Sequence, residues 1–261
     1  LYVVHEAFPV LAERSGLSGF LFTDPWAPLA NPPAFGIVHA WVSTIAITTL
    51  SLLLAMPFGF GIGIFVAEVA PLAAKTALRP FIDLLAGIPS VVYGFFGYVT
   101  LIPLFETRFD MVTGESILAA AMVLAVMVLP YIASTSAEAF HAVPRELKET
   151  AMAQGVTRWH TIRRIIVPCA LPGMFAAVVL GVARALGETA PLIVAGAVIG
   201  SFSGTNVAKM ITGNYTALPV VIYDWSRRPQ EAFRADAAAG IVVLLVAVLA
   251  VNAAAILLRA R

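Results

Sequence analysis

Long stretches without ionised side chains constrain this chain more than any other feature of its sequence. Four stretches of at least 22 residues contain no Asp, Glu, Lys or Arg, and a fifth is interrupted only by one Arg and one Glu. A helix needs about 20 mostly apolar residues to cross a bilayer, because its backbone polar groups must be satisfied within the helix. The sequence therefore predicts an all-α, polytopic membrane bundle with about five spans. The four stretches are residues 36–67, 84–105, 116–137 and 237–258, and the fifth is residues 165–208.

The overall composition agrees with a membrane protein. Hydrophobic residues make up 60% of the chain and charged residues only 12%, whereas charged residues make up about 25% of an average soluble domain. A net charge of +1 argues against a nucleic-acid partner and leaves membrane lipid as the surrounding medium. Cys169 is the single cysteine, so we expect no internal disulfide. His39 and His141 are not paired with further ligands in a pattern typical of a metal site, so we expect none.

The basic residues predict which ends of the spans face the cytoplasm. Lys and Arg accumulate in short cytoplasmic loops, and residues 138–168 carry five of them. With this loop inside and one span in residues 165–208, residues 1–35 form an extracytoplasmic N-terminal segment and residues 36–261 form the transmembrane domain. The number of spans is then odd, so we expect a sixth span before Leu1. Two spans in residues 165–208 are the alternative, and the charges alone do not decide between them.

The loop at residues 138–168 predicts two short helices joined by a turn. Pro144 suits the first turn of a helix, the run ETAMAQ (residues 149–154) has high helix propensity, and Gly155 suits the residue that ends a helix. A second short helix through Trp159 then runs into the next span. From periodicity alone, an amphipathic hairpin lying on the lipid headgroups is an equal alternative to a protein-docking loop.

The same loop resembles the EAA motif of the permease subunits of ATP-binding-cassette (ABC) importers. That motif reads Glu-Ala-Ala, three residues, Gly, nine residues, Ile, one residue and Leu-Pro. This sequence keeps the spacing throughout and has Thr and Val where the motif has its first Ala and its Leu. The resemblance implies the type I (MetI-like) permease fold and a place in a bacterial or archaeal inner membrane. The matching residues are Glu149, Thr150, Ala151, Gly155, Ile165, Val167 and Pro168.

The resemblance also implies that Glu149, Ala151 and Gly155 couple the chain to an ATPase. In that family the first short helix of the loop docks in a groove of the ATPase subunit, where small residues permit close approach and glycine permits a sharp turn. The chain has no G-x-x-x-x-G-K-[ST] phosphate loop. We therefore expect a transport subunit that is not an enzyme and binds no cofactor, with ATP and Mg²⁺ on the partner. The implied complex contains a second, homologous permease, two ATPase subunits and an extracytoplasmic binding protein.

Three further stretches are similar to the permeases of the phosphate-specific importer, and two of them, through GETAPL and RPQEAF, favour its PstA type over its PstC type. This similarity covers nearly all of residues 36–261 and implies phosphate as substrate and a phosphate-binding protein as partner. An arginine does not distinguish oxyanions, so a sulfate or molybdate permease is one alternative, and an ion-coupled secondary transporter is another. The stretches are GIPSVVYGFFG (residues 87–97), RALGETAPLIVAG (residues 184–196) and WSRRPQEAFRADAAAGI (residues 225–241).

Arg184 and Glu188 are the predicted residues of the substrate pathway. A guanidinium offers paired donors to an oxyanion and stays charged, and charged side chains within a bilayer usually face a bundle interior or a wet cavity. At a spacing of four we expect the two on one helix face, with Glu188 neutralising Arg184 until phosphate competes for it. A purely structural pair, or side chains snorkelling toward the outer boundary, is the alternative. Gly187 and Pro191 predict a helix break, which favours one span plus a partial segment in residues 165–208.

Two local patterns each have a structural and a functional interpretation. Gly59 and Gly63 form a GxxxG spacing, which lets membrane helices approach closely; packing within the chain is favoured over a dimer interface. A polar and aromatic cluster precedes the last span and consists of Asp224, Trp225, Arg227, Arg228 and Glu231. An interfacial anchor for that helix is favoured over a docking surface for an extracytoplasmic binding protein.

Overall fold

The computed structural model describes residues 2–14, 16–22, 26–27, 34–109, 114–197 and 213–259. Nearly all of these residues are helical, and the short strands β1 and β2 form one antiparallel pair. The predicted all-α class is confirmed. In chain order the elements are α1 (Tyr2–Phe8), η1 (Pro9–Arg14), α2 (Gly16–Phe22), β1 (Trp26–Ala27), β2 (Ala34–Phe35), α3 (Val38–Ile64), η2 (Phe65–Val69), α4 (Leu72–Ala86), α5 (Ser90–Phe96), η3 (Gly97–Leu101), α6 (Ile102–Phe109), α7 (Ile117–His141), α8 (Arg145–Ala153), α9 (Arg158–Thr161), η4 (Ile162–Ile166), α10 (Val167–Gly187), α11 (Ala190–Val194), α13 (Leu218–Arg227) and α14 (Glu231–Arg259).

Five helical segments among the described residues are long and apolar enough to cross a membrane. They overlap the four uncharged stretches and the first part of the fifth. Within that fifth stretch α11 has only five residues, too few to cross a bilayer, and residues 198–208 lie outside the described residues. A sixth span before Leu1 stays a prediction. The five segments are Val38–Val69, Ser90–Arg108, Ile117–His141, Arg158–Gly187 and Phe233–Ala254.

The chain divides into two compact units, each built from separate parts of the sequence. Four of the five boundaries fall within α3, α7, α10 and α14, so each of these long helices contributes residues to both units; the fifth lies between α4 and α5. The predicted boundary after residue 35 lies inside the first unit, and the extracytoplasmic location of residues 1–35 stays a prediction. The first unit comprises Leu1–Leu50, Pro89–Leu124 and Ala185–Ala250, and the second comprises Ser51–Ile88, Ala125–Arg184 and Val251–Arg261.

The first unit has an apolar core to which the N-terminal helices contribute. Ala7 and Phe20, from α1 and α2, are buried in one cluster with Trp225 of α13 and residues of α14. The backbone N–H of Leu218 donates a 2.8 Å hydrogen bond to the hydroxyl of Thr44 on α3. This bond satisfies one of the N–H groups that the start of α13 leaves without a partner in the helix, and it fixes α13 to α3.

In the second unit, α3 packs closely on α7 through two glycines. A Cβ added to Gly59 would lie 2.7 Å from Cγ2 of Ile132, and one added to Gly63 would overlap the hydroxyl of Ser136. Gly61, on the same helix, has no atom within 4 Å of such a Cβ. The GxxxG spacing therefore serves packing within the chain, as the favoured interpretation predicted.

Leucine at position 63 is expected to destabilise the protein, and leucine at position 61 is not. The larger side chain would have to push α3 and α7 apart, and overpacking of this kind costs about 1–3 kcal/mol. Thermal unfolding of the purified variants in one detergent checks this, with Gly61→Leu as the matched control because that position is open. Equal midpoints for Gly63→Leu and the control would contradict the close packing.

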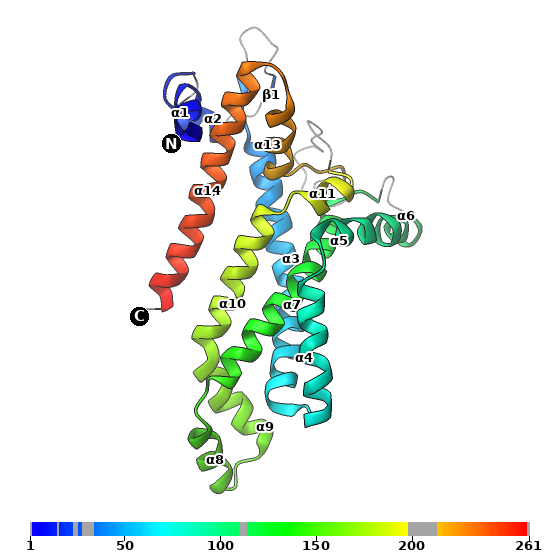
Figure 1. Cartoon of the computed structure of the whole chain (residues 1–261), viewed down its shortest axis with the longest axis vertical. Helices are drawn as coiled ribbons and strands as arrows, with labels where there is room; N and C mark the ends of the chain where they lie inside the picture. Colours follow the sequence, from blue (N-terminus) through cyan, green and yellow to red (C-terminus); the bar gives the residue numbers. More distant parts are fainter. Residues whose placement is uncertain are drawn as a thin grey trace. The chain divides into compact units, whose positions relative to one another are not determined.

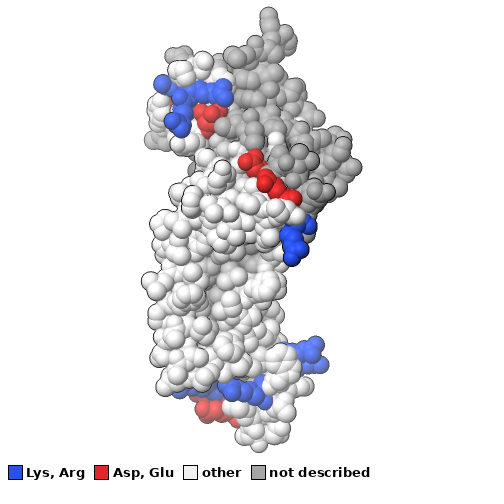
Figure 2. Space-filling view, turned by 90° about the vertical axis from the view of Figure 1, so that its right-hand side faces the viewer, with Lys and Arg blue, Asp and Glu red and all other residues white. Residues whose placement is uncertain are grey.

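Charged side chains of the second unit gather at the end that carries α8 and α9 (Figure 1). Figure 2 shows a blue band of Lys and Arg at this end, with white surface directly next to it. A basic boundary beside an uncharged helical surface is typical of the cytoplasmic side of a membrane protein, and it agrees with the predicted orientation. Among the basic residues of this unit, Lys75, Lys148 and Arg158 contact residues 67 and 68 of η2.

Candidate functional site

The loop after α7 folds into the two short helices that the sequence predicts. Pro144 lies one residue before α8, whereas we expected it within the first turn. Gly155 follows α8 with φ +80°, a left-handed conformation that L side chains rarely adopt. Thr157 then caps α9 by accepting a hydrogen bond from the backbone N–H of His160. We call α8, the turn and α9 the coupling hairpin.

The coupling hairpin has one packed face and one open face. Ala151 is 6% exposed and is the one buried residue of α8. Glu149 and Gly155 are exposed, as are the large apolar side chains of Met152 and Trp159, at 48% and 68%. Of the three predicted coupling residues, Glu149 and Gly155 are therefore accessible to a partner, and Ala151 instead packs against the chain itself.

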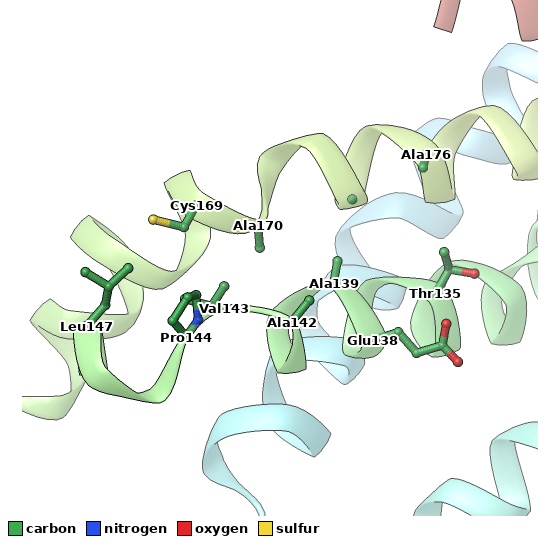
Figure 3. Close-up of a pocket in the computed structure, with 11 residues that line it drawn as sticks. Thr135, Glu138, Ala139, Ala142, Val143, Pro144, Leu147, Cys169, Ala170 and Ala176 are labelled. Carbon is green, nitrogen blue, oxygen red and sulfur yellow. The ribbon is translucent and has the colours of Figure 1, made fainter. Parts of the chain in front are cut away.

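A cavity of about 400 Å³ lies between the end of α7, the start of α8 and the start of α10 (Figure 3). Its walls are mostly small and apolar, because α7 and α10 approach closely at Ala139 and Gly173, where an added Cβ would overlap the alanine. Figure 3 shows Leu147 at one end of the cavity and Thr135 and Glu138 at the other. The lining offers no positive charge, so this cavity is unsuited to an oxyanion.

Arg184 lies in the last turn of α10, stacked on an aromatic ring of α7. Its guanidinium carbon is 4.0 Å from the ring centroid of Tyr131, and the hydroxyl of Tyr131 donates a 2.5 Å hydrogen bond to the carbonyl of Ala86. One turn earlier, a Cβ on Gly181 would lie 3.1 Å from both Leu52 and Val128, so α10 runs close to α3 and α7 here. At 4.0 Å the guanidinium makes a cation–π contact with the face of the Tyr131 ring.

Glu188 lies beyond the end of α10. Because this helix ends at Gly187 and α11 begins at Ala190, the expectation that Arg184 and Glu188 share one helix face is wrong. The predicted break at Gly187 and Pro191 is confirmed, and it is what removes Glu188 from the helix.

The segment after Glu188 is held firmly within the first unit. A Cβ on Gly94 of α5 would lie 2.6 Å from Cα of Pro191, so α5 and α11 are in direct backbone contact. The hydroxyl of Tyr215 lies 3.1 Å from the carbonyl of Leu192 and 3.2 Å from that of Ala195. Burial, together with the Glu115 carboxylate, raises the pKa of this hydroxyl, so it remains a donor at neutral pH and closes the short helix.

The polar cluster before the last span forms a second pocket, of about 460 Å³, in the first unit. Arg228 donates a 2.8 Å hydrogen bond to Asp224 and stacks on Phe233 at 4.8 Å. Arg227 donates to the hydroxyl of Tyr223 at 3.2 Å. These contacts tie the cluster to the start of α14, in the manner of the predicted anchor, and they leave both arginines exposed.

Two interactions at these sites involve residues that the sequence analysis did not identify. Tyr131 supports Arg184, and Glu68 binds Lys148 of α8. Glu68 could have been found from the sequence, because it is the carboxylate that directly follows the uncharged stretch of residues 36–67. An aromatic residue in an apolar span gave no comparable signal for Tyr131.

The chain is similar to a known family of membrane proteins. The family described as "Binding-protein-dependent transport system inner membrane component" matches residues 59–261. The chain is 41% identical over 205 residues to the probable ABC transporter permease protein YqgH of Bacillus subtilis, covering 78% of this chain and 61% of that protein. It is 33% identical over 235 residues to phosphate transport system permease protein PstC 1 of Mycobacterium tuberculosis, covering 82% of this chain and 70% of that protein. The chain thus spans less than two thirds of the length of YqgH.

Two solved structures show the same fold. A chain of the inward-facing MetNI methionine ABC transporter matches with a TM-score of 0.65 at 20% identity, over 85% of this chain and 94% of that one. A chain of a bacterial ABC transporter that imports alginate matches with a TM-score of 0.62 at 17% identity, over 97% and 88%. The predicted MetI-like permease fold is confirmed. The phosphate permeases among these relatives carry the name PstC, whereas GETAPL and RPQEAF favoured PstA.

Proposed function

The chain belongs to the family of binding-protein-dependent transport system inner membrane components, and we propose that it forms the translocation pathway of an ATP-driven phosphate importer. As a member of that family it is a multi-pass inner-membrane permease of the ABC importer class. Phosphate as substrate is supported by relatives named phosphate transport system permease protein PstC, at 32–35% identity.

The position of Arg184, in a membrane helix and against the ring of Tyr131, is the observation that carries the proposal. A guanidinium within a membrane helix is costly unless it faces the bundle or water, and Tyr131 holds this one at the end of α10. Its planar, paired donors match two oxygens of a phosphate ion. Arg184 is therefore the proposed phosphate contact in the pathway.

Glu188 is the proposed countercharge of the empty pathway. It follows Arg184 by four residues, so the Cα atoms of the two residues lie at most about 15 Å apart in any conformation. Because α10 ends between the two residues, a change of backbone conformation at Gly187 would alter the distance between the two side chains without unfolding a helix. Phosphate and Glu188 would then alternate as partners of the arginine during alternating access.

The coupling hairpin is the proposed contact with a separate ATPase, which carries ATP and Mg²⁺. Glu149 and Gly155 lie on its exposed side, beside the apolar side chains of Met152 and Trp159. Exposed apolar side chains rimmed by charge are typical of a protein interface. In the proposed complex a second permease, two ATPase subunits and an extracytoplasmic phosphate-binding protein complete the importer.

Uptake by the reconstituted complex tests the proposal. Proteoliposomes that contain this chain, its partner permease, the ATPase and the binding protein are expected to accumulate phosphate only with ATP, and to accumulate it in preference to sulfate and molybdate. Uptake driven by an ion gradient without the ATPase would contradict an ABC importer. Preferred uptake of sulfate or molybdate would show that phosphate is not the substrate, and the chain would remain a permease of an ABC importer.

A further inference from the structure

We propose that Glu68 is a positioning residue that ties the coupling hairpin to the end of α3. Through Lys148 and Arg158 it holds both helices of the hairpin, so a movement of the hairpin is transmitted to that membrane span. The inference rests on the proposed function, because it takes a partner ATPase as the source of the movement.

The first connection is an ion pair between η2 and α8. Nζ of Lys148 donates a 2.5 Å hydrogen bond to Oε1 of Glu68 and a 3.2 Å bond to the carbonyl of Phe140 at the end of α7. The Lys148 and Glu68 side chains are only 15% and 13% exposed. Water and salt therefore screen this pair less than a surface pair, and loss of one partner leaves a poorly solvated charge.

The second connection runs from α9 to the same residue. The guanidinium of Arg158 donates a hydrogen bond to the backbone carbonyl of Glu68. Next to it, Lys75 of α4 donates a 2.6 Å bond to the carbonyl of Ala67. Three elements, α8, α9 and α4, thus converge on residues 67 and 68, where the π-helical turn η2 ends α3.

An apolar cluster packs beside these polar contacts, and the polar contacts add directionality to that packing. Ala67, Phe140, Ile162 and Ala170 belong to one buried cluster that joins η2 to α7, η4 and α10. Apolar packing is non-directional and tolerates sliding. The ion pair and the Arg158 bond are directional, so they fix the position of the hairpin relative to α3.

Transport and hydrolysis measured in the same proteoliposomes test the role of Glu68. Glu68→Gln keeps the size of the side chain and removes its charge; it is expected to lower phosphate transported per ATP hydrolysed about five-fold. Lys148→Met is expected to do the same. The double variant should be no worse than either single variant, because the two changes remove one interaction. Lys148→Arg keeps a charged donor and should retain most of the coupling.

Glu106→Gln is the matched control, since Glu106 is exposed on α6. This variant should transport as much phosphate per ATP hydrolysed as the wild type. A wild-type complex without ATP-driven uptake would overturn the proposed function itself. Given wild-type uptake, an unchanged ratio in Glu68→Gln, or uptake and hydrolysis that fall in parallel, would overturn the positioning role. If Glu68→Gln does not assemble with the ATPase, the two lysine variants decide. Equal phosphate transport per ATP hydrolysed in Lys148→Arg and Lys148→Met would overturn the positioning role.

Discussion

Replacing Arg184 with glutamine is expected to lower ATP-driven phosphate uptake by about a hundred-fold or more. The substitution removes the charge and the paired donors, and each hydrogen bond to a charged group contributes roughly 1.5–3 kcal/mol, where 1.4 kcal/mol is ten-fold. Loss of the stack on Tyr131 has a smaller effect, of about 0.5–2 kcal/mol on stability. Initial uptake rates of labelled phosphate, at equal amounts of assembled complex, measure the change.

Two further variants separate the chemistry of Arg184 from its charge alone. Arg184→Lys keeps the charge and loses the planar fork, so its uptake should lie between wild type and Arg184→Gln. Arg108→Gln removes an exposed arginine of α6 and should transport normally. Wild-type uptake in Arg184→Gln would remove this residue from the substrate pathway and leave the structural stack as its role.

The sequence was sufficient for the features that depend on a single segment. Four membrane spans follow from the length of an uncharged stretch, and the fifth follows from a stretch interrupted only by Arg184 and Glu188. The coupling hairpin follows from helix-forming residues that end at Gly155. The end of α10 at Gly187 was likewise predicted from one glycine and one proline. These are local properties, because a bilayer and a helix impose the same requirements wherever the segment packs.

The sequence was insufficient where function depends on which helices meet. Tyr131 supports Arg184 across the boundary of α7 and α10, and Glu68 binds a lysine eighty positions away. No periodicity within one helix reports such a contact. The same limit explains Glu188: a spacing of four implies a shared face only while the helix continues, and the predicted break should have excluded that expectation.

Replacing Gly155 with valine is expected to uncouple the complex, lowering phosphate uptake per ATP by about a hundred-fold, because displacing a positioned element by about 1 Å can cost that much. Gly155 has φ +80°, which a β-branched residue avoids. The turn would therefore change, and α8 would leave it in another direction. Membrane insertion should be retained, since the turn lies outside the spans. Uptake and hydrolysis in proteoliposomes, with co-purification of the ATPase, measure the effect.

Asparagine and aspartate at the same position show which property of Gly155 matters. Both residues tolerate a left-handed conformation better than valine does, and no atom lies within 4 Å of an added Cβ, so this chain can accommodate them. If Gly155→Asn couples normally and Gly155→Val does not, the backbone conformation is what the complex requires. If both fail, the open space beside the turn is occupied by the partner, and Gly155→Asp should fail as well. Normal coupling in Gly155→Val would mean that the hairpin reaches its partner through α8 alone, independent of the geometry of its turn.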